Sequence, residues 1–259
     1  MNHKNKTKIN QLISQWPRGT VAAASYLNSI GFSGDLLNRY KTSEWIQSFG
    51  RGAYKLFGDN VEWPGALYAL QAQLKLNIHA GGKSALETKG YAHYPPPELH
   101  RLFLYSVRGQ KLPAWFKRDA LGIDIVFVRT NLFPSDFAEG FSELKDREFS
   151  VKMSSPERAA MEMLHLVPKM IGFEEAFLIM ENLVSLRPFL VEGLLKHCNS
   201  IKVKRLFLYM ADKHGHPWLP QVELSRVDLG KGKRHMVKGG KLDKKYNITV
   251  PRDHEEVPA

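Results

Sequence analysis

Polar and basic side chains recur between Ser33 and Thr42 at the spacing of one helical face. Leu36, Leu37 and Tyr40 mark the apolar side of that helix. The positions left facing outward are Ser33, Gly34, Asn38, Arg39, Lys41 and Thr42. In the DNA major groove arginine pairs with guanine and asparagine with adenine, while lysine and threonine suit phosphates. The pattern therefore predicts a DNA recognition helix over residues 33–42.

A second candidate DNA contact is Arg51, which stands between Gly50 and Gly52. Residues 45–49 and 53–57 have the composition of strands, and the two glycines favour a tight turn between them. Arg51 at the tip of this hairpin is suited to enter a minor groove or to meet the DNA backbone. Lys55 follows on the returning strand. We therefore expect a basic wing beside the recognition helix.

Two further helices precede the recognition helix. Residues 9–16 carry an apolar stripe that ends at Pro17, and residues 21–29 form a second helix, capped by Thr20 and ended by Gly31. Three helices followed by a hairpin make a winged helix-turn-helix. The alternative is a three-helix packing module whose polar face is only solvated, since such modules also mediate protein contacts.

The net charge favours a polyanionic partner. The chain of 259 residues carries a formal net charge of +11. Residues 1–90 hold 11 Lys and Arg against 5 Asp and Glu, and residues 196–252 hold 14 against 4. Neutralising phosphates and releasing counterions supplies much of the affinity of a protein for DNA. The charge distribution thus supports DNA binding by the first region and indicates a second basic region near the C-terminus.

The second basic region combines lysine with glycine. Glycine-rich loops carrying lysine can bring amides and ammonium groups to an anion. The predicted second basic surface consists of Lys202, Lys204, Arg205, Lys231, Lys233, Arg234 and Lys238. The alternative is a cationic face that is only solvated.

Patterns that would indicate an enzyme are weak. Residues 230–234 lack the spacing of a phosphate loop, and His214 with His216 lacks a third metal ligand, so a structural turn is favoured there. Asp124 with Glu143 and Lys145 faintly resembles a metal-dependent nuclease, which is kept as an alternative. The lone Cys198 is expected to be a buried apolar thiol. We expect no enzymatic activity, no cofactor and no metal.

The whole chain is predicted to be α+β with two domains. The run Pro95-Pro96-Pro97 reads as a linker, which places a winged helix-turn-helix domain at 1–94 and a mixed α/β domain at 95–259. No apolar run approaches the roughly 20 residues that span a bilayer, and the N-terminus is no signal peptide, so we expect a cytoplasmic location and no membrane contact. Further helices are predicted at 61–74, 83–88, 158–167, 173–183, 188–198 and 201–213, and strands at 99–107, 123–128 and within 222–250.

Five stretches of this sequence resemble the AbiEi-type antitoxins of abortive-infection, or type IV, toxin–antitoxin systems. They are residues 50–94, 104–116, 153–168, 201–219 and 238–252. The resemblance implies a winged helix-turn-helix that binds inverted repeats in its own promoter, with two protomers on the DNA, and represses its operon. It also implies a C-terminal antitoxin domain, and as functional partner a nucleotidyltransferase-like toxin encoded next door, which is counteracted without a stable complex.

The resemblance assigns roles to the residues found above. The DNA-contacting role falls to the helix at 33–42 and to Arg51, and the antitoxin role falls to the C-terminal region with its basic residues. The alternative function is a stand-alone transcriptional regulator that responds to a ligand through its C-terminal domain.

Overall fold

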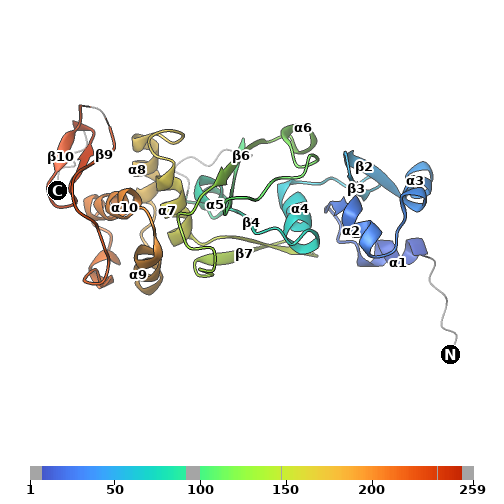
Figure 1. Ribbon diagram of the computed structural model, residues 1–259, viewed down its shortest axis with the longest axis horizontal. Helices are drawn as coiled ribbons and strands as arrows, with labels where there is room; N and C mark the ends of the chain where they lie inside the picture. Colours follow the sequence, from blue (N-terminus) through green and yellow to red (C-terminus); the bar gives the residue numbers. More distant parts are fainter. Residues whose placement is uncertain (1–7, 92–99, 147, 238, 253–259) are drawn as a thin grey trace.

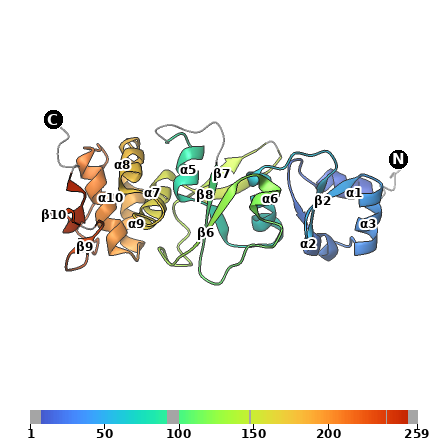
Figure 2. The same ribbon diagram turned by 90° about the horizontal axis from the view of Figure 1, so that it is seen from above.

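The computed structural model describes residues 8–91, 100–146, 148–237 and 239–252. The predicted linker at Pro95–Pro97 and the predicted site residue Lys238 lie outside them. The described chain is elongated and has three parts along its length (Figures 1 and 2). A small unit of helices and short strands lies at the N-terminal end, a sheet lies in the middle, and a group of helices with a second small sheet lies at the other end. Its fold is α+β, as predicted.

The N-terminal part is a winged helix-turn-helix. Its elements are α1 (Lys8–Gln15), β1 (Ala22–Ala23), α2 (Ala24–Ser29), α3 (Gly34–Thr42), β2 (Ile46–Gly50) and β3 (Ala53–Leu56). The strands form one antiparallel sheet in the order β1-β3-β2. One boundary differs from the prediction, because residues 22–23 pair with Tyr54 and Ala53 of β3 and so are extended, not helical.

This winged helix has a core of its own. Leu12, Leu27, Leu37, Ile46 and Leu56 are buried together, one or more from nearly every element. Each such side chain contributes about 1.5–3 kcal/mol when it leaves water. The orientation of α3 is therefore fixed by packing inside the N-terminal unit.

The middle part is a five-stranded mixed sheet. It contains α4 (Trp63–Tyr68), a π-helical turn η1 (Ala69–Gln73), β4 (Ile78–Ala80), α5 (Gly82–Thr88), β5 (Arg101–Ser106), α6 (Arg118–Leu121), β6 (Asp124–Arg129), β7 (Phe141–Lys145) and β8 (Ser150–Ser154). The strand order is β6-β5-β4-β8-β7, with β4 parallel to β8 and β5 parallel to β6. Strands β4, β7 and β8 were not predicted. Because β4 lies at the centre of this sheet, residues 78–88 pack with later parts of the chain, and a boundary near residue 95 remains a prediction.

The C-terminal part is mostly helical. It contains α7 (Pro156–His165), α8 (Phe173–Glu181), α9 (Pro188–His197), α10 (Ile201–Lys213) and a short 3-10 turn η2 (Leu219–Gln221). A second small sheet follows, formed by β9 (Arg234–His235), β10 (Lys241–Asp243) and β11 (Ile248–Val250) in the order β10-β11-β9. The four predicted helices of this part are confirmed. No helix within the described ranges is long and apolar enough to cross a membrane.

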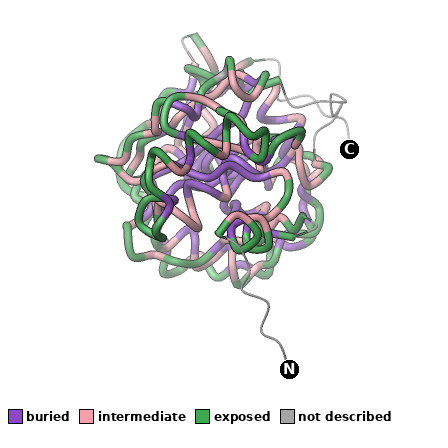
Figure 3. Tube along the Cα trace, turned by 90° about the vertical axis from the view of Figure 1, so that its right-hand side faces the viewer, coloured by how far each residue is buried: buried purple, intermediate pink, exposed green. Residues whose placement is uncertain are grey.

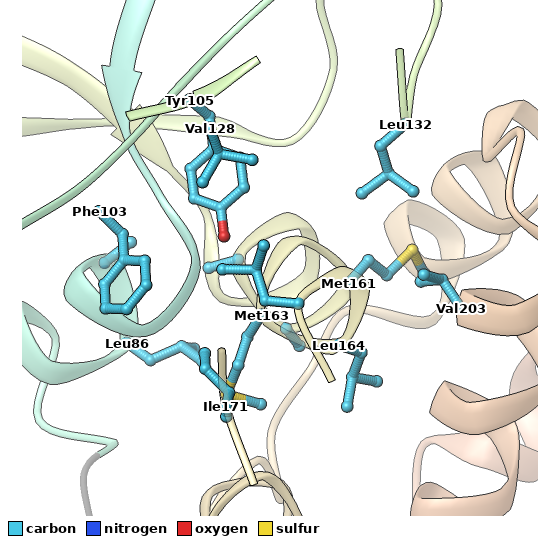
Figure 4. Packing of buried hydrophobic residues seen from close by; sticks show 14 of the residues in the cluster. Leu86, Phe103, Tyr105, Val128, Leu132, Met161, Met163, Leu164, Ile171 and Val203 are labelled. Carbon is cyan, nitrogen blue, oxygen red and sulfur yellow. The ribbon is translucent and has the colours of Figure 1, made fainter. Parts of the chain in front are cut away.

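Helix α7 joins the sheet to the C-terminal helices. Met163 of α7 packs toward Leu86 and Phe103 of the middle part, whereas Met161 points toward Val203 of α10 (Figure 4). Nearly every α7 residue is buried. The view along the molecule shows buried chain running through its centre and exposed chain around the rim (Figure 3). The middle and C-terminal parts thus share one continuous core.

Candidate nucleic-acid interface

Helix α3 presents its polar side to solvent, as predicted from its apolar spacing. Leu37 is fully buried, with 0% of its surface exposed, and anchors the other side of the helix. Four of the predicted DNA-contacting residues lie on the exposed surface of α3: Asn38, Arg39, Lys41 and Thr42. As the sequence indicated, Gly31 follows the end of α2 with a φ of 93°, and Ser33 lies at the N-cap of α3.

The side chain of Ser33 has a structural role. Its Oγ accepts a hydrogen bond from the backbone N–H of Leu36 at 3.3 Å, which satisfies one of the open donors of the first turn. Thr42 similarly donates its hydroxyl to the carbonyl of Asn38 at 3.1 Å. Asn38, Arg39 and Lys41 therefore carry most of the free hydrogen-bonding capacity of this face.

The positively charged side chains of α3 and of the wing are not neutralised by neighbouring carboxylates of the described chain. Among the residues that the structure describes, Arg39, Lys41 and Arg51 form no ion pair. Arg39 and Lys41 lie in the last turn, where a positive charge is favoured by the helix dipole. A polyanion approaching this face would meet unpaired positive charge.

The predicted wing is present as the β2–β3 hairpin. Gly52 has a φ of 85°, which glycine adopts readily, and Arg51 is exposed in the turn. The ring of Phe49 meets Trp115 of the middle part edge-on, with 6.2 Å between ring centroids. A Cβ on Gly50 would lie 3.0 Å from the Cβ of Trp115, so this turn also holds the two parts together.

Lys55 is not a free cation of the wing. Its ammonium is half-buried and donates to the backbone carbonyl of Asp59 at 2.7 Å. This bond holds the connection between β3 and α4, and a DNA contact by Lys55 remains a prediction.

Two members of the predicted second basic surface, both on α10, are buried. Arg205 and Lys204 are only 3% and 4% exposed. Arg205 donates four hydrogen bonds to backbone carbonyls, those of Leu229, Gly230, Gly232 and Asn247, at 2.6–3.0 Å. Lys204 donates to the carbonyl of Asp228 at 3.0 Å. All of these carbonyls except that of Asn247 belong to the irregular loop at 228–232, where the buried cations supply the donors that a sheet would otherwise provide.

Lys202 is engaged in the same way. Its Nζ donates to the carbonyls of His165 and Val167 at 3.0 and 2.6 Å. Burial lowers the pKa of Lys202, and the nearby Lys169 lowers it further. Of the predicted residues, Lys231 and Lys233 remain exposed and Arg234 is half-buried. Among the described members of the predicted set, full exposure is thus limited to Lys231 and Lys233.

The weak enzymatic patterns are not assembled by the fold. Asp124 lies on β6 and Glu143 and Lys145 lie on β7, at opposite edges of the sheet with three strands between them. Neighbouring strands are about 4.8 Å apart, so Asp124 and Glu143 are separated by roughly 19 Å of sheet. Asp124 therefore does not form one site with Glu143 and Lys145, as the nuclease alternative requires.

The paired histidines have a structural role. His214 and His216 hydrogen-bond through Nε2 to the carbonyls of Phe177 and Met180 at 3.0 and 2.8 Å. They fasten the turn after α10 to helix α8. In the described residues, no three His, Cys, Asp or Glu side chains gather as a metal site requires.

A buried polar cluster in the middle part was not predicted. The Glu162 carboxylate accepts hydrogen bonds from His79 Nε2, Arg158 Nε, the Ser154 hydroxyl and the backbone N–H of Gly82, at 2.7–3.0 Å. Burial alone would raise the pKa of Glu162, but the charge and hydrogen bond of His79, with Arg158 and Ser154, lower it to about 2. The sequence held one signal, since Arg158 and Glu162 have the i, i+4 spacing of an ion pair.

Comparison with known proteins places these features in a family. The model of the family described as transcriptional regulator, AbiEi antitoxin, type IV toxin–antitoxin system matches residues 99–251. The model of the AbiEi antitoxin N-terminal domain matches residues 5–95. The crystal structure of the RV2827C protein from Mycobacterium tuberculosis is similar, with a TM-score of 0.58 and 16% identity over 93% of this chain and 88% of that chain. This likeness concerns the fold. No curated protein matches the chain.

Proposed function

The chain belongs to the AbiEi antitoxin family of transcriptional regulators of type IV toxin–antitoxin systems, and from that membership we propose that it represses its own operon by binding an inverted repeat through α3. Helix α3 enters the major groove of each half-site. Two protomers bind together, and their recognition helices are then spaced by about one turn of DNA, roughly 34–36 Å.

The main support for this proposal is that the polar face of α3 is exposed to solvent. Asn38 and Arg39 are free to meet base edges, and Lys41 is free to meet a phosphate. Helix α3 also lies in the part of the molecule farthest from the C-terminal helices (Figure 1). A DNA duplex can thus approach it without meeting the middle or C-terminal parts. Replacement of counterions by Arg39 and Lys41 makes the affinity fall as salt rises.

Replacing Arg39 by alanine is expected to weaken binding to the promoter of the operon. The loss is about 1–3 kcal/mol if Arg39 reads a base, which raises the Kd roughly 5- to 150-fold. Fluorescence anisotropy with a labelled promoter duplex measures this, beside a scrambled duplex of equal length.

The matched control is Arg226→Ala, which removes an exposed arginine from the C-terminal part. It should bind the promoter like the parent protein. If Arg39→Ala also binds like the parent, or if it weakens both duplexes equally, Arg39 does not read the operator.

We further propose that the middle and C-terminal parts carry the antitoxin activity against a nucleotidyltransferase-like toxin encoded next to this gene. Family membership supports the antitoxin role, and the shared core of the two parts indicates that they act as one unit. The test is growth of cells that express the neighbouring gene, with and without this chain. Lys231 and Lys233 are the exposed, described members of the predicted basic set, and they are the residues to replace in that assay.

A further inference from the structure

A cavity of about 190 Å³ opens beside the buried Glu162 cluster. Strands β4, β5, β7 and β8, helix α7 and the loop at 130–138 all contribute to its wall. A cavity of roughly 150 Å³ is large enough to hold benzene. Aromatic rings make up much of the lining, including Phe133, Phe137 and Phe141. The cavity therefore has the size and the walls for a ligand with one flat ring.

His79, in the wall of this cavity, holds an unpartnered nitrogen. The residue is 5% exposed and lines the cavity. Its Nε2 bonds Glu162, while its Nδ1 is buried with no hydrogen-bond partner among the described residues. A buried polar atom left in this way costs about 1–3 kcal/mol.

The carboxylate of Glu162 is not available to a ligand. It already accepts four hydrogen bonds, from His79, Gly82, Ser154 and Arg158. A carboxylate has about four lone-pair sites, so its capacity is filled. The other carboxylate that lines the cavity, Asp136, is on an exposed residue of the loop. The interior of the cavity therefore has no free anion.

Two cations that line the cavity, in contrast, keep hydrogen-bond donors for a ligand, although Arg158 is already paired with Glu162. Arg158 bonds Glu162 through Nε and the carbonyl of Glu139 through Nη1, which leaves Nη2 without a partner among the described residues. The Lys152 ammonium makes no ion pair with them and lies 4.3 Å from the centre of the Phe141 ring. The Arg158 guanidinium lies 4.2 Å from the same ring. Lys152 is an exposed residue, and the partial burial of its ammonium and the charge of Arg158 lower its pKa.

We propose that this cavity binds a small aromatic carboxylate. The carboxylate pairs with Arg158 and Lys152, and the ring lies among Phe133, Phe137 and Phe141, beside His79. This site is separate from α3, so this proposal does not depend on the proposed DNA binding.

The loop at 130–138, which lines the cavity, also contacts the chain at the end of α9. The carbonyl of Leu132 in this loop accepts from the backbone N–H of Asn199 at 2.8 Å. The ring of Phe137 stacks on His197 at 4.4 Å between centroids. An occupied cavity would therefore fasten the sheet to the chain between α9 and α10.

The test is calorimetric titration of the full chain with benzoate. Benzamide supplies the ring without the charge, and acetate supplies the charge without the ring. We expect benzoate to bind with a Kd of about 1 mM or tighter, and the other two probes at least about tenfold more weakly. Equal binding of benzamide and benzoate, or no heat with benzoate, would overturn the proposal.

Two further measurements locate the bound benzoate. Lys152→Met keeps the length of the side chain and removes its charge, and should weaken benzoate about tenfold. Lys145→Met makes the same change at an exposed position of β7 that does not line the cavity, and should have no effect. In protein labelled with ¹⁵N-histidine, benzoate should shift the His79 Nδ1 signal, assigned by its loss in His79→Gln. Unchanged affinity in Lys152→Met, or an unmoved His79 signal, would also refute the site.

Discussion

The Glu162→Ala variant is expected to have a free energy of unfolding about 3–5 kcal/mol lower than the parent, because it breaks a buried, hydrogen-bonded ion pair. The substitution leaves the Arg158 guanidinium buried without its carboxylate. It also leaves His79, Ser154 and the Gly82 N–H without their acceptor. These groups come from β4, α5, β8 and α7, so the loss should affect the whole shared core.

Urea denaturation followed by circular dichroism measures this effect. The matched control is Glu143→Ala, which removes an exposed carboxylate from β7 and should change the stability by less than about 0.5 kcal/mol. Glu162→Gln should fall between the two, because the amide retains one acceptor oxygen. A Glu162→Ala protein as stable as the control would show that the cluster contributes nothing to the fold.

The same carboxylate predicts a specific acid sensitivity. Its pKa is about 2 in the folded protein, below the ordinary value of 4.5, so the folded state binds this proton less readily than the unfolded state. The stabilisation is therefore complete above about pH 5 and is lost as the pH falls toward 2, a change of about 3 kcal/mol. Urea denaturation between these pH values should show this slope in the parent, and a smaller slope in Glu162→Gln.

Arg205→Ala is expected to lower the free energy of unfolding by about 3 kcal/mol, because four backbone carbonyls lose a charged donor. The guanidinium joins α10 to the carbonyls of the loop at 229–232 and to Asn247, which immediately precedes β11. Without it, the loop and the small C-terminal sheet should open more often than the rest of the molecule.

Two measurements check this prediction. Urea denaturation gives the change in stability, and limited trypsin digestion should cut faster at Lys231 and Lys233 in Arg205→Ala than in the parent. Arg226→Ala removes an exposed arginine and should match the parent in both. If Arg205→Ala is as stable and as resistant as that control, the four hydrogen bonds do not hold the loop.

The winged helix could be predicted because its signals are local. Gly31 and Gly52 adopt positive φ at the ends of short elements, and Ser33 caps the helix that follows it. Each of these features depends on residues only a few positions away. Strand β4 could not be predicted, since it has three residues, all buried, and its partners Ser106 and Met153 lie 28 and more positions later in the chain.

For two of the basic C-terminal residues, the local sequence predicted an exposed position that the fold does not give them. Lys204 and Arg205 stand in a run of charges that reads as a surface, yet both are buried against carbonyls that lie 24–42 positions later. Nothing near them in the sequence indicates those acceptors. The pair Arg158 and Glu162 is similar, because i, i+4 ion pairs are usually exposed and only the packing of α5 and β8 around α7 buries this one.

The most direct test of DNA binding by α3 uses the lone cysteine. Cys198 is 3% exposed, and burial raises the pKa of its thiol to about 11, so it should resist labelling. A Ser43→Cys protein, altered just after α3 at an exposed position, can then carry an iron–EDTA group at one place. With promoter DNA, we expect strand cleavage at two positions related by the inverted repeat, and none from the same reagent on Arg226→Cys. Cleavage from Arg226→Cys, with none from Ser43→Cys, would contradict the assignment of α3 as the DNA-reading helix.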